Sequence, residues 1–575
     1  MGRGFAEILS EDLQGSPQRY AIQFRTLHSL DAALGPRPFV PGISTERTAA
    51  LVAGADEIVY GTYTVVNGVL RANIFAEDLA RHKMPLAAGA SGPIADGIFP
   101  VAGALARQFG ETRPFGTRSE PALREYCAGL EAPNAAAAAQ SFAAATAADP
   151  DFGRAWDAWL ETAIQQHDRA AADHIVTQAR VRESRFAALE RAQFDLDAAR
   201  LQGGIPAQIA ALRDLARLDP SDPLKHRALA ESLMSIRDLD AAIVEFRRTL
   251  TIRPDDVIAL NMMGYAAAYA GDLPTAIRVL RGYEQLRPND PNPLDSLGDV
   301  HFALGHFREA EQFYLAAYGK SAAFMHGGES LKAAQARLMT GDVKGATALF
   351  ERFAAAREAA HDPAVPYHRA TWKWQTGARR AAIADMDRLA RANAAGPLHE
   401  LAARADAQAV IWLLESGDRA GAAAHARQAL AEAGPGTAGM AAMVATLALP
   451  QSPPLPANWP MADYARAYAL LFDKQFARAA QVLQDLYHRP ATGLDDGLSV
   501  LLAWAYAESG DWRRAQPLLR LTPLPEATGL PMFSSLYFPR IFYLRGMVLE
   551  REGQRAEAAR YYELFRSLSG PDATT

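Results

Sequence analysis

The chain has 575 residues, a formal net charge of -6 at pH 7 and one cysteine. This length exceeds what a single hydrophobic core usually serves, so several domains or one elongated array are expected. The mild acidity and the lack of a Lys/Arg-rich run argue against nucleic acid as a partner. The lone Cys127 excludes an internal disulfide and any multi-cysteine metal site.

The first hundred residues predict a small α/β domain. The predicted segments, in chain order, are a helix through Phe5 to Leu13, a short strand from Tyr20 to Phe24, a helix from Thr45 to Ala53 and a helix from Ile98 to Phe109. Between them, the run from Ile58 to Phe75 is rich in β-branched and aromatic residues and is interrupted by Asn67-Gly68. That dipeptide between apolar runs predicts an antiparallel β-hairpin.

The run from Gly54 to Tyr63, followed by the hairpin and by Ala76-Glu77-Asp78, resembles the TolB-like amino-terminal domain of bacterial proteins. The resemblance implies an α/β domain that precedes a repeat array. Members usually open with an additional strand before the first helix, whereas this sequence begins at the helix, so either its start has been removed or its sheet is one strand short. In many relatives, that upstream region leads back to a membrane helix and to a kinase, cyclase or DNA-binding domain.

Three consecutive stretches that start at Pro223, Val257 and Pro291 share residue classes at a spacing of 34. The repeated positions are Leu229, Met263 and Leu297, then Ala230, Gly264 and Gly298, then Ala242, Ala276 and Ala310, and finally Phe246, Leu280 and Tyr314. Turn residues divide each stretch into two apolar-periodic halves, and Pro254 and Pro288 stop the second half. Each stretch therefore predicts a helical hairpin that needs neighbours to bury its apolar face.

These positions resemble tetratricopeptide (TPR) repeats, and weaker copies extend the pattern over residues 115 to 568. The predicted fold is mainly α, a TPR-type solenoid of about eleven or twelve hairpins after the small α/β domain. The predicted division is 1–114 TolB-like domain, 115–449 solenoid, 450–460 proline-rich seam, 461–568 C-terminal repeats and 569–575 tail. A long surface loop that leaves the stack continuous is the alternative interpretation of the seam.

Sequence signatures of catalysis are mostly missing, so we expect no enzyme, no cofactor and no metal site. Gly319-Lys320-Ser321 resembles the end of a phosphate-binding loop, but the leading glycine is replaced by Tyr314. No zincin motif and no Gly-x-Ser-x-Gly elbow occurs. The chain also lacks an apolar run long enough to cross a bilayer.

In TPR proteins the first helix of each hairpin lines the concave side of the array. The positions that this resemblance places on the concave face are Arg227, Glu231, Asn261, Tyr265, Asn292, Asp295, Asp299 and Phe302, together with Tyr464, Tyr468, Trp504 and Tyr543 in the C-terminal repeats. The first group is polar with more acid than base, which suits an extended peptide carrying positive charge. The aromatic group has the residue types of binding hot spots. The alternative for the first group is an ordinary hydrated helix face, and the alternative for the aromatic group is core packing between adjacent hairpins.

We therefore expect a non-enzymatic scaffold that binds a protein or an extended peptide. The alternative is the sensory or regulatory part of a bacterial signalling enzyme or transcription regulator whose catalytic or DNA-binding domain lies upstream. The expected location is the cytoplasm if Met1 is the true start, and the periplasm if an upstream signal or membrane helix is missing. The sequence does not predict the oligomeric state.

Overall fold

The computed structural model describes residues 1–13, 20–22, 27, 30, 33–35, 46–79, 81, 83–110, 112–452, 455, 459, 461–489, 497–525 and 533–570. The chain forms two compact units. The first, called unit 1, comprises Met1–Leu233 and Val244–Asp256; the second, unit 2, comprises Met234–Ile243 and Val257–Thr575. Most of the predicted seam at 450–460 lies outside the described residues.

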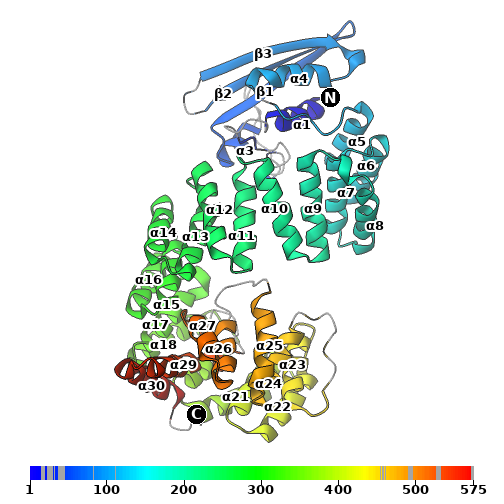
Figure 1. Ribbon diagram of the computed structural model, residues 1–575. Helices are drawn as coiled ribbons and strands as arrows, with labels where there is room; N and C mark the ends of the chain where they lie inside the picture. Colours follow the sequence, from blue (N-terminus) through cyan, green and yellow to red (C-terminus); the bar gives the residue numbers. More distant parts are fainter. Residues whose placement is uncertain are drawn as a thin grey trace. The chain divides into compact units, whose positions relative to one another are not determined.

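The N-terminal part of unit 1 contains a three-stranded antiparallel sheet of order β1-β2-β3 (Figure 1). The strands are β1 (Glu57–Val66), β2 (Val69–Asp78) and β3 (Lys83–Pro93), and the nearby helices are α1 (Gly2–Leu13), α3 (Glu46–Val52) and α4 (Phe99–Ala106). The predicted hairpin is confirmed, since Val66 pairs with Val69 across Asn67 and Gly68. Both turn residues have a positive φ, as a two-residue type I′ hairpin requires.

Two features of the α/β part differ from the sequence prediction. Tyr20 to Ile22 forms no strand, and the rest of that predicted strand lies outside the described residues. The third strand, Lys83–Pro93, was not predicted, because its alanines, glycines and prolines give no β-branched alternation. Helix α4 covers β2 and β3. The core beneath it, which includes Phe5 and Ile74, continues through Phe115 to Phe152 in the first hairpins.

The rest of the chain confirms a mainly α, TPR-type solenoid of helical hairpins (Figure 1). Hairpins at the unit 1 end are α5 (Glu120–Leu130) with α6 (Ala135–Ala148), α7 (Gly153–Gln165) with α8 (Arg169–Arg180), α9 (Ala188–Gln202) with α10 (Ile205–Leu218), and α11 (Pro223–Ser235) with α12 (Leu239–Ile252). The division between the units falls inside the α11–α12 hairpin.

Unit 2 continues the same alternation of first and second helices. Its pairs are α13 (Val257–Ala270) with α14 (Leu273–Leu286), α15 (Asn292–Ala303) with α16 (Phe307–Lys320), α17 (Gly328–Leu338) with α18 (Val343–Ala359), α19 (Val365–Gln375) with α20 (Arg379–Asn393), α21 (His399–Glu415) with α22 (Arg419–Glu432), α24 (Ala462–Phe472) with α25 (Phe476–Tyr487), α26 (Leu498–Glu508) with α27 (Trp512–Leu518), and α29 (Arg540–Arg551) with α30 (Arg555–Ser569). Two further helices are α23 (Ala438–Ala448) and the short α28 (Ser534–Tyr537).

The repeated small positions bring the two helices of a hairpin into close contact. A Cβ atom added to Gly264 would lie 2.6 Å from Leu280 Cγ, and one added to Gly298 would lie 2.5 Å from Tyr314 Cδ1. Real Cβ atoms do not approach that closely, so glycine is required where a large side chain of the second helix crosses the first. The 34-residue spacing thus reports a packing constraint that these two hairpins share.

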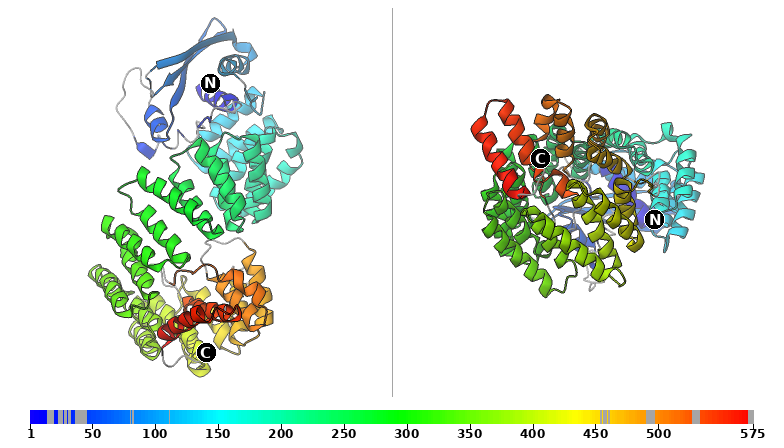
Figure 2. Two further views of the ribbon diagram at one scale, coloured as in Figure 1. Left: turned by 60° about the vertical axis from the view of Figure 1, so that its left-hand side comes forward. Right: turned by 90° about the horizontal axis from the view of Figure 1, so that it is seen from below.

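Unit 2 closes on itself, so that residues far apart in the sequence meet. The Arg237 guanidinium lies 4.4 Å from the centre of the Tyr487 ring and donates to the Tyr487 carbonyl at 2.8 Å. The turn at Gly377 meets Gly570 after α30. In Figure 2 the red C-terminal helices accordingly lie beside green helices of the same unit. The first helices of unit 2 are covered as a result: nearly every residue of α17 and α21 is buried, whereas only a few residues of α22 are.

Candidate functional site

The positions predicted for the concave face are distributed over both units. Arg227 and Glu231 belong to unit 1, and the other ten belong to unit 2. Arg227 donates to both carboxylate oxygens of Asp256, at 3.1 and 2.8 Å, and its Nε lies 3.6 Å from Glu231. Glu231 remains exposed. This pair stays a predicted partner surface.

Three predicted residues of unit 2 join a buried polar network around Lys332, which the sequence analysis did not single out. The ammonium group of Lys332 lies 2.5 Å from Asp295 Oδ1 and 3.0 Å from Asp299 Oδ1. The Tyr265 hydroxyl donates to Asp299 at 2.8 Å. Burial alone would lower the pKa of Lys332, but the carboxylates of Asp299 and Asp295 outweigh it and hold the pKa above its ordinary value. The polar side-chain atoms of Tyr265, Asp295, Asp299 and Lys332 are therefore paired within this network.

Glu329 on α17 completes this network as a fourth ionisable side chain. Its side chain is fully buried beside Asp295, and no described group donates a hydrogen bond to either carboxylate oxygen. Burial and the neighbouring Asp295 raise the pKa of Glu329 to about 9. At neutral pH the Glu329 carboxyl is accordingly protonated, which allows it to donate to Asp295.

The remaining predicted positions are more buried than the residues of an accessible binding surface would be. Phe302 and Tyr468 are buried, with exposures of 1% and 5%, and Tyr468 stacks on Phe533 at 4.6 Å between ring centres. The Trp504 ring lies 3.8 Å from the Arg540 guanidinium. The other four, Asn261, Asn292, Tyr464 and Tyr543, are half-buried. Their role in partner binding stays a prediction.

The chain's own C-terminal part covers part of this side of unit 2. Directly after α27, the Thr522 amide donates to the Ala303 carbonyl at the end of α15, at 2.7 Å. The Arg520 guanidinium donates to the Tyr269 carbonyl near the end of α13. Thr522 is 1% exposed. The segment Leu519–Pro525 is thus seated against the carbonyl ends of two first helices, α13 and α15.

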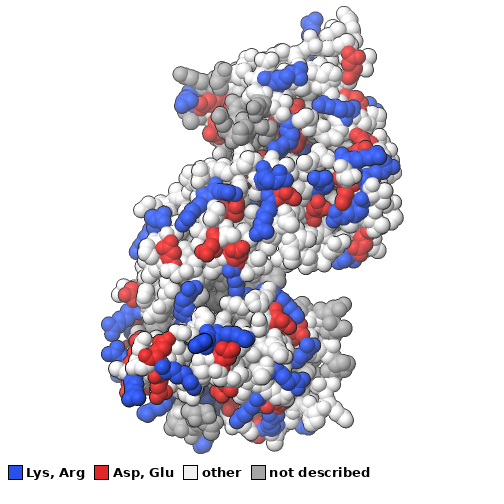
Figure 3. All heavy atoms as spheres, in the orientation of Figure 1, with Lys and Arg blue, Asp and Glu red and all other residues white. Residues whose placement is uncertain are grey.

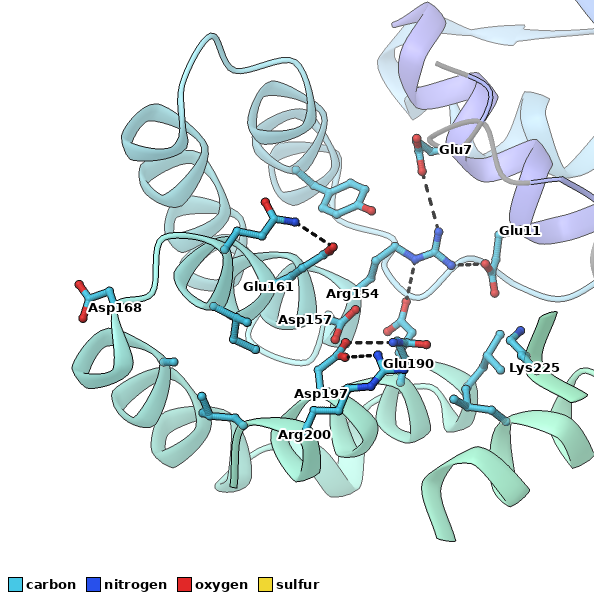
Figure 4. A pocket seen from close by; sticks show the side chains of 18 of the residues that line it. Glu7, Glu11, Arg154, Asp157, Glu161, Asp168, Glu190, Asp197, Arg200 and Lys225 are labelled. Carbon is cyan, nitrogen blue, oxygen red and sulfur yellow. Dashed lines mark hydrogen bonds and ion pairs between the residues drawn. The ribbon is translucent and has the colours of Figure 1, made fainter. Parts of the chain in front are cut away.

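Unit 1, in contrast, contains an open pocket of about 800 Å³ (Figure 4). It is lined by α1, α7 and α9, with contributions from α5, the α7–α8 turn, α8, α10 and α11. The charged residues of the lining are Glu7, Glu11, Asp157, Glu161, Asp168, Glu190 and Asp197, and Arg154, Arg169, Arg200 and Lys225.

Helical spacing explains why these side chains share the pocket. Residues three, four and seven positions apart lie on one face of a helix. On α7, Arg154, Asp157 and Glu161 follow this spacing, and the opposite face of the helix carries buried residues such as Ala163. On α9, the same spacing places Glu190, Gln193, Asp197 and Arg200 in the pocket. Both are first helices of their hairpins.

Arg154 is the centre of the pocket wall and joins three helices. Its guanidinium forms an ion pair with Glu11 of α1, and lies 3.9 Å from Glu7 and 3.8 Å from Glu190 of α9 (Figure 4). The Phe115 ring packs under it with a centre 5.3 Å away. Burial alone would lower the pKa of Arg154, but the surrounding carboxylates, Glu11 foremost, raise it above its ordinary value. Arg154 is thus a permanent cation that stabilises the carboxylates around it.

The lining is more acidic than basic, with seven carboxyl groups against four cationic side chains. On the face shown in Figure 3, by comparison, positive and negative side chains are interspersed. Burial raises the pKa of Glu190 to about 7 although Arg154 lies beside it. The pocket therefore becomes more negative as pH rises through neutrality. Such a lining is complementary to a positively charged group of a ligand.

Sequence reasoning missed this pocket because the first hairpins are degenerate copies of the repeat. The inner offsets were applied only to the three clearest repeats and to the C-terminal ones. The stripe of Arg154, Asp157 and Glu161 was the available signal, since charges three and four residues apart mark one helix face. The contribution of Glu7 and Glu11 was not detectable, because α1 reaches α7 only through the tertiary fold.

Other classes of site have no counterpart among the residues that the structure describes. No cluster of three or more His, Cys, Asp or Glu side chains there is arranged to hold a metal ion. Within the same residues, no helix has both the length and the apolar character that crossing a membrane requires. Burial raises the pKa of the Cys127 thiol to about 12, so this cysteine is a poor nucleophile at neutral pH.

No model of a known protein family matches the chain, and a search of curated proteins finds no match. Solved structures that resemble it include a crystal structure of MamA protein, which is 18% identical with a TM-score of 0.27 and covers 30% of this chain and 92% of MamA. The MamA RS-1 ArsTM double mutant is 16% identical with a TM-score of 0.27 and covers 30% of this chain and 96% of its own. The likeness covers less than a third of this chain.

Proposed function

We propose that this chain is a non-enzymatic scaffold that binds a partner protein through a positively charged segment, and that the acidic pocket of unit 1 holds this segment. One observation carries the proposal: the first helices α7 and α9 present an open, mainly acidic lining in a cavity of about 800 Å³. A volume of that size accepts one or two long side chains with the adjoining backbone.

The lining is preorganised for charge recognition. Asp197 accepts from Gln193 at 2.9 Å and from Arg200 at 3.0 Å, and Glu161 accepts from Gln165 at 3.1 Å. These contacts hold the carboxylates in place before a ligand arrives, which reduces the entropy lost on binding. A lysine or arginine of the partner would meet oriented acceptors.

We also propose that the N-terminal α/β part is a TolB-like domain. Its three-stranded antiparallel sheet with α4 on one face supports this assignment. In this proposal the α/β part helps to build the partner site, because Glu7, Ser10 and Glu11 of α1 form one side of the pocket.

Binding of short extended peptides tests the function. Peptides of equal length that carry lysine, glutamine or glutamate at the same positions are titrated against the full chain by fluorescence anisotropy. We expect only the lysine peptide to bind, with an affinity that falls as salt is added. Equal affinity for the three peptides would overturn the proposal.

A charge-reversal variant locates the site. Asp157→Lys combined with Glu161→Lys should weaken binding of the lysine peptide by about ten-fold or more, because two attractive carboxylates become repulsive cations. Asp214→Lys is the matched control, since Asp214 lies on the second helix α10 with 58% of its side chain exposed and is not part of the pocket lining. Equal loss of affinity in both variants would place the binding elsewhere.

A further inference from the structure

The two edges of the N-terminal sheet differ in how they are protected. At one edge, β3 contains Pro85 and Pro93 and pairs with β2 through an irregular register between Ala76 and Asp78. Prolines, irregular pairing and small residues discourage the addition of another strand. At the other edge, β1 pairs with β2 in unbroken register over all ten of its residues. No residue of β1 from Ile58 to Val66 is charged or a proline.

From Ile58 to Val66, β1 has an exposed outer edge that no other described strand pairs with. The described residues give β1 a strand partner only on its β2 side. All residues from Gly61 to Val66 are exposed, and the large apolar side chains among them, Tyr63, Val65 and Val66, are 44%, 45% and 56% exposed. A long apolar edge strand of this kind is a template for pairing with another strand.

The helices under the sheet cover β1 less completely than β2. Pairing of Tyr63 with Ala72 and of Val65 with Leu70 places both side chains on the face that α4 covers, because Ala72 and Leu70 are buried there. Helix α4 packs on β2 and β3, while α1 reaches β1 through Phe5, whose ring centre is 5.9 Å from that of Tyr63. The apolar layer is thus incomplete at this edge.

From these observations we infer that β1 pairs antiparallel with β1 of a second copy of this chain, which joins the two three-stranded sheets into one. The strand is self-complementary. A two-fold axis perpendicular to the sheet brings like faces together, with Val59, Gly61, Tyr63 and Val65 of both copies on one side and Ile58, Tyr60, Thr62, Thr64 and Val66 on the other. No like charges meet along this pairing.

The same symmetry explains why assembly ends at two copies. Once β1 is paired, the joined sheet has β3 at both outer edges, and each β3 carries its prolines and irregular pairing. A two-fold contact uses the same surface on both partners and closes, whereas an unprotected second edge would allow open-ended growth. The inferred assembly is therefore a dimer.

Mass measurement on the full chain tests the inference. Sedimentation velocity over a concentration series should show a species with twice the 62.1 kDa chain mass. Thr62→Lys combined with Thr64→Lys should raise the dimer dissociation constant by about ten-fold or more, because lysines of the two copies would face one another. Asn73→Lys is the matched control: Asn73 pairs with Thr62, is exposed, and lies on the central strand away from the edge.

Cysteine crosslinking gives a second readout that does not depend on the lysine variants folding. In a Cys127→Ser background, Thr62→Cys or Thr64→Cys should form an intermolecular disulfide under mild oxidation, and Asn73→Cys should not. A chain that stays monomeric at all concentrations, a dimer that the double lysine variant does not weaken, or growth beyond two copies would each overturn the inference.

Discussion

The first helices occupy the same place in the hairpins of both units, but their surroundings differ. In unit 1, α7 and α9 direct charged side chains into an open pocket. In unit 2, α17 and α21 are buried almost throughout, and the segment Leu519–Pro525 is seated against the ends of α13 and α15. The comparison teaches that a TPR-type repeat sets which face is available, while the rest of the chain decides whether that face is open.

Both units place a cation among carboxylates, with different consequences. Lys332 is almost fully buried and is held by Asp295 and Asp299 within one face of first helices. Arg154 keeps 19% of its side chain exposed at the wall of the pocket and connects α1 with α7 and α9. Lys332 is therefore part of a buried core in unit 2, whereas Arg154 is part of the wall of a cavity in unit 1.

The largest expected effect is in unit 2. Lys332→Ala leaves the carboxylates of Asp295 and Asp299 buried without their cation, which should lower the free energy of unfolding by about 3 to 5 kcal/mol. Thermal melting followed by circular dichroism measures this loss of stability. Lys344→Ala, on the exposed side of α18, is the control and should change stability by less than about 0.5 kcal/mol. Similar melting of the two variants would show that the network is not structural.

The corresponding substitution in unit 1 should lower the free energy of unfolding by somewhat less, because water enters the pocket. Arg154→Ala removes the partner of Glu11, Glu7 and Glu190, and we expect a loss of about 2 to 4 kcal/mol. Limited proteolysis should in addition cleave near α1 sooner than in the unchanged chain. Arg200→Ala at the rim, with 52% of the side chain exposed, should have little effect on either readout. Early cleavage in the rim variant as well would contradict the assigned role of Arg154.

Two substitutions of Thr522 test whether the segment Leu519–Pro525 is anchored on unit 2. Thr522→Pro removes the amide that donates to Ala303 and should destabilise unit 2 by about 1 to 3 kcal/mol. Thr522→Val keeps the amide and removes a buried hydroxyl that has no described partner, so it should be neutral or stabilising. Chemical denaturation separates the two. If both variants behave alike, the segment is not anchored as described.

A further test in unit 2 is a pH dependence caused by Glu329. Its pKa is about 9 in the folded chain against an ordinary value of 4.5, so the folded state binds the proton more tightly than the unfolded state. The resulting stability is fully present below about pH 4.5 and is lost as pH rises through about 9. Glu329→Gln keeps a neutral side chain at all pH values. Its melting temperature should fall less between pH 6 and 9 than that of the unchanged chain, and parallel curves would place the proton elsewhere.

The sequence predicted the local parts of the fold well. The spacing of Gly264 with Leu280 and of Gly298 with Tyr314 reported contacts within a hairpin, and Asn67-Gly68 predicted a turn between adjacent strands. These features depend on residues that are near one another in the chain. β3 was missed because alanine and glycine carry no strand signal, although they suit an edge packed closely on its neighbour.

The candidate site depends on distant contacts, which explains why it was not predicted. The approach of Arg237 to Tyr487 and of Thr522 to Ala303 joins segments more than two hundred residues apart, and no local pattern encodes such closure. The pocket of unit 1 likewise needs α1 opposite α7. From the sequence alone, the inner face of each hairpin could be predicted, but not which inner faces stay open.

Hydrogen–deuterium exchange of the full chain, with and without the lysine peptide, tests the central claim most directly. We predict slower exchange of α7 and α9 on peptide binding and unchanged exchange of α13, α15 and α17. Slower exchange confined to α13, α15 and α17, with α7 and α9 unchanged, would contradict the account and return the partner site to unit 2.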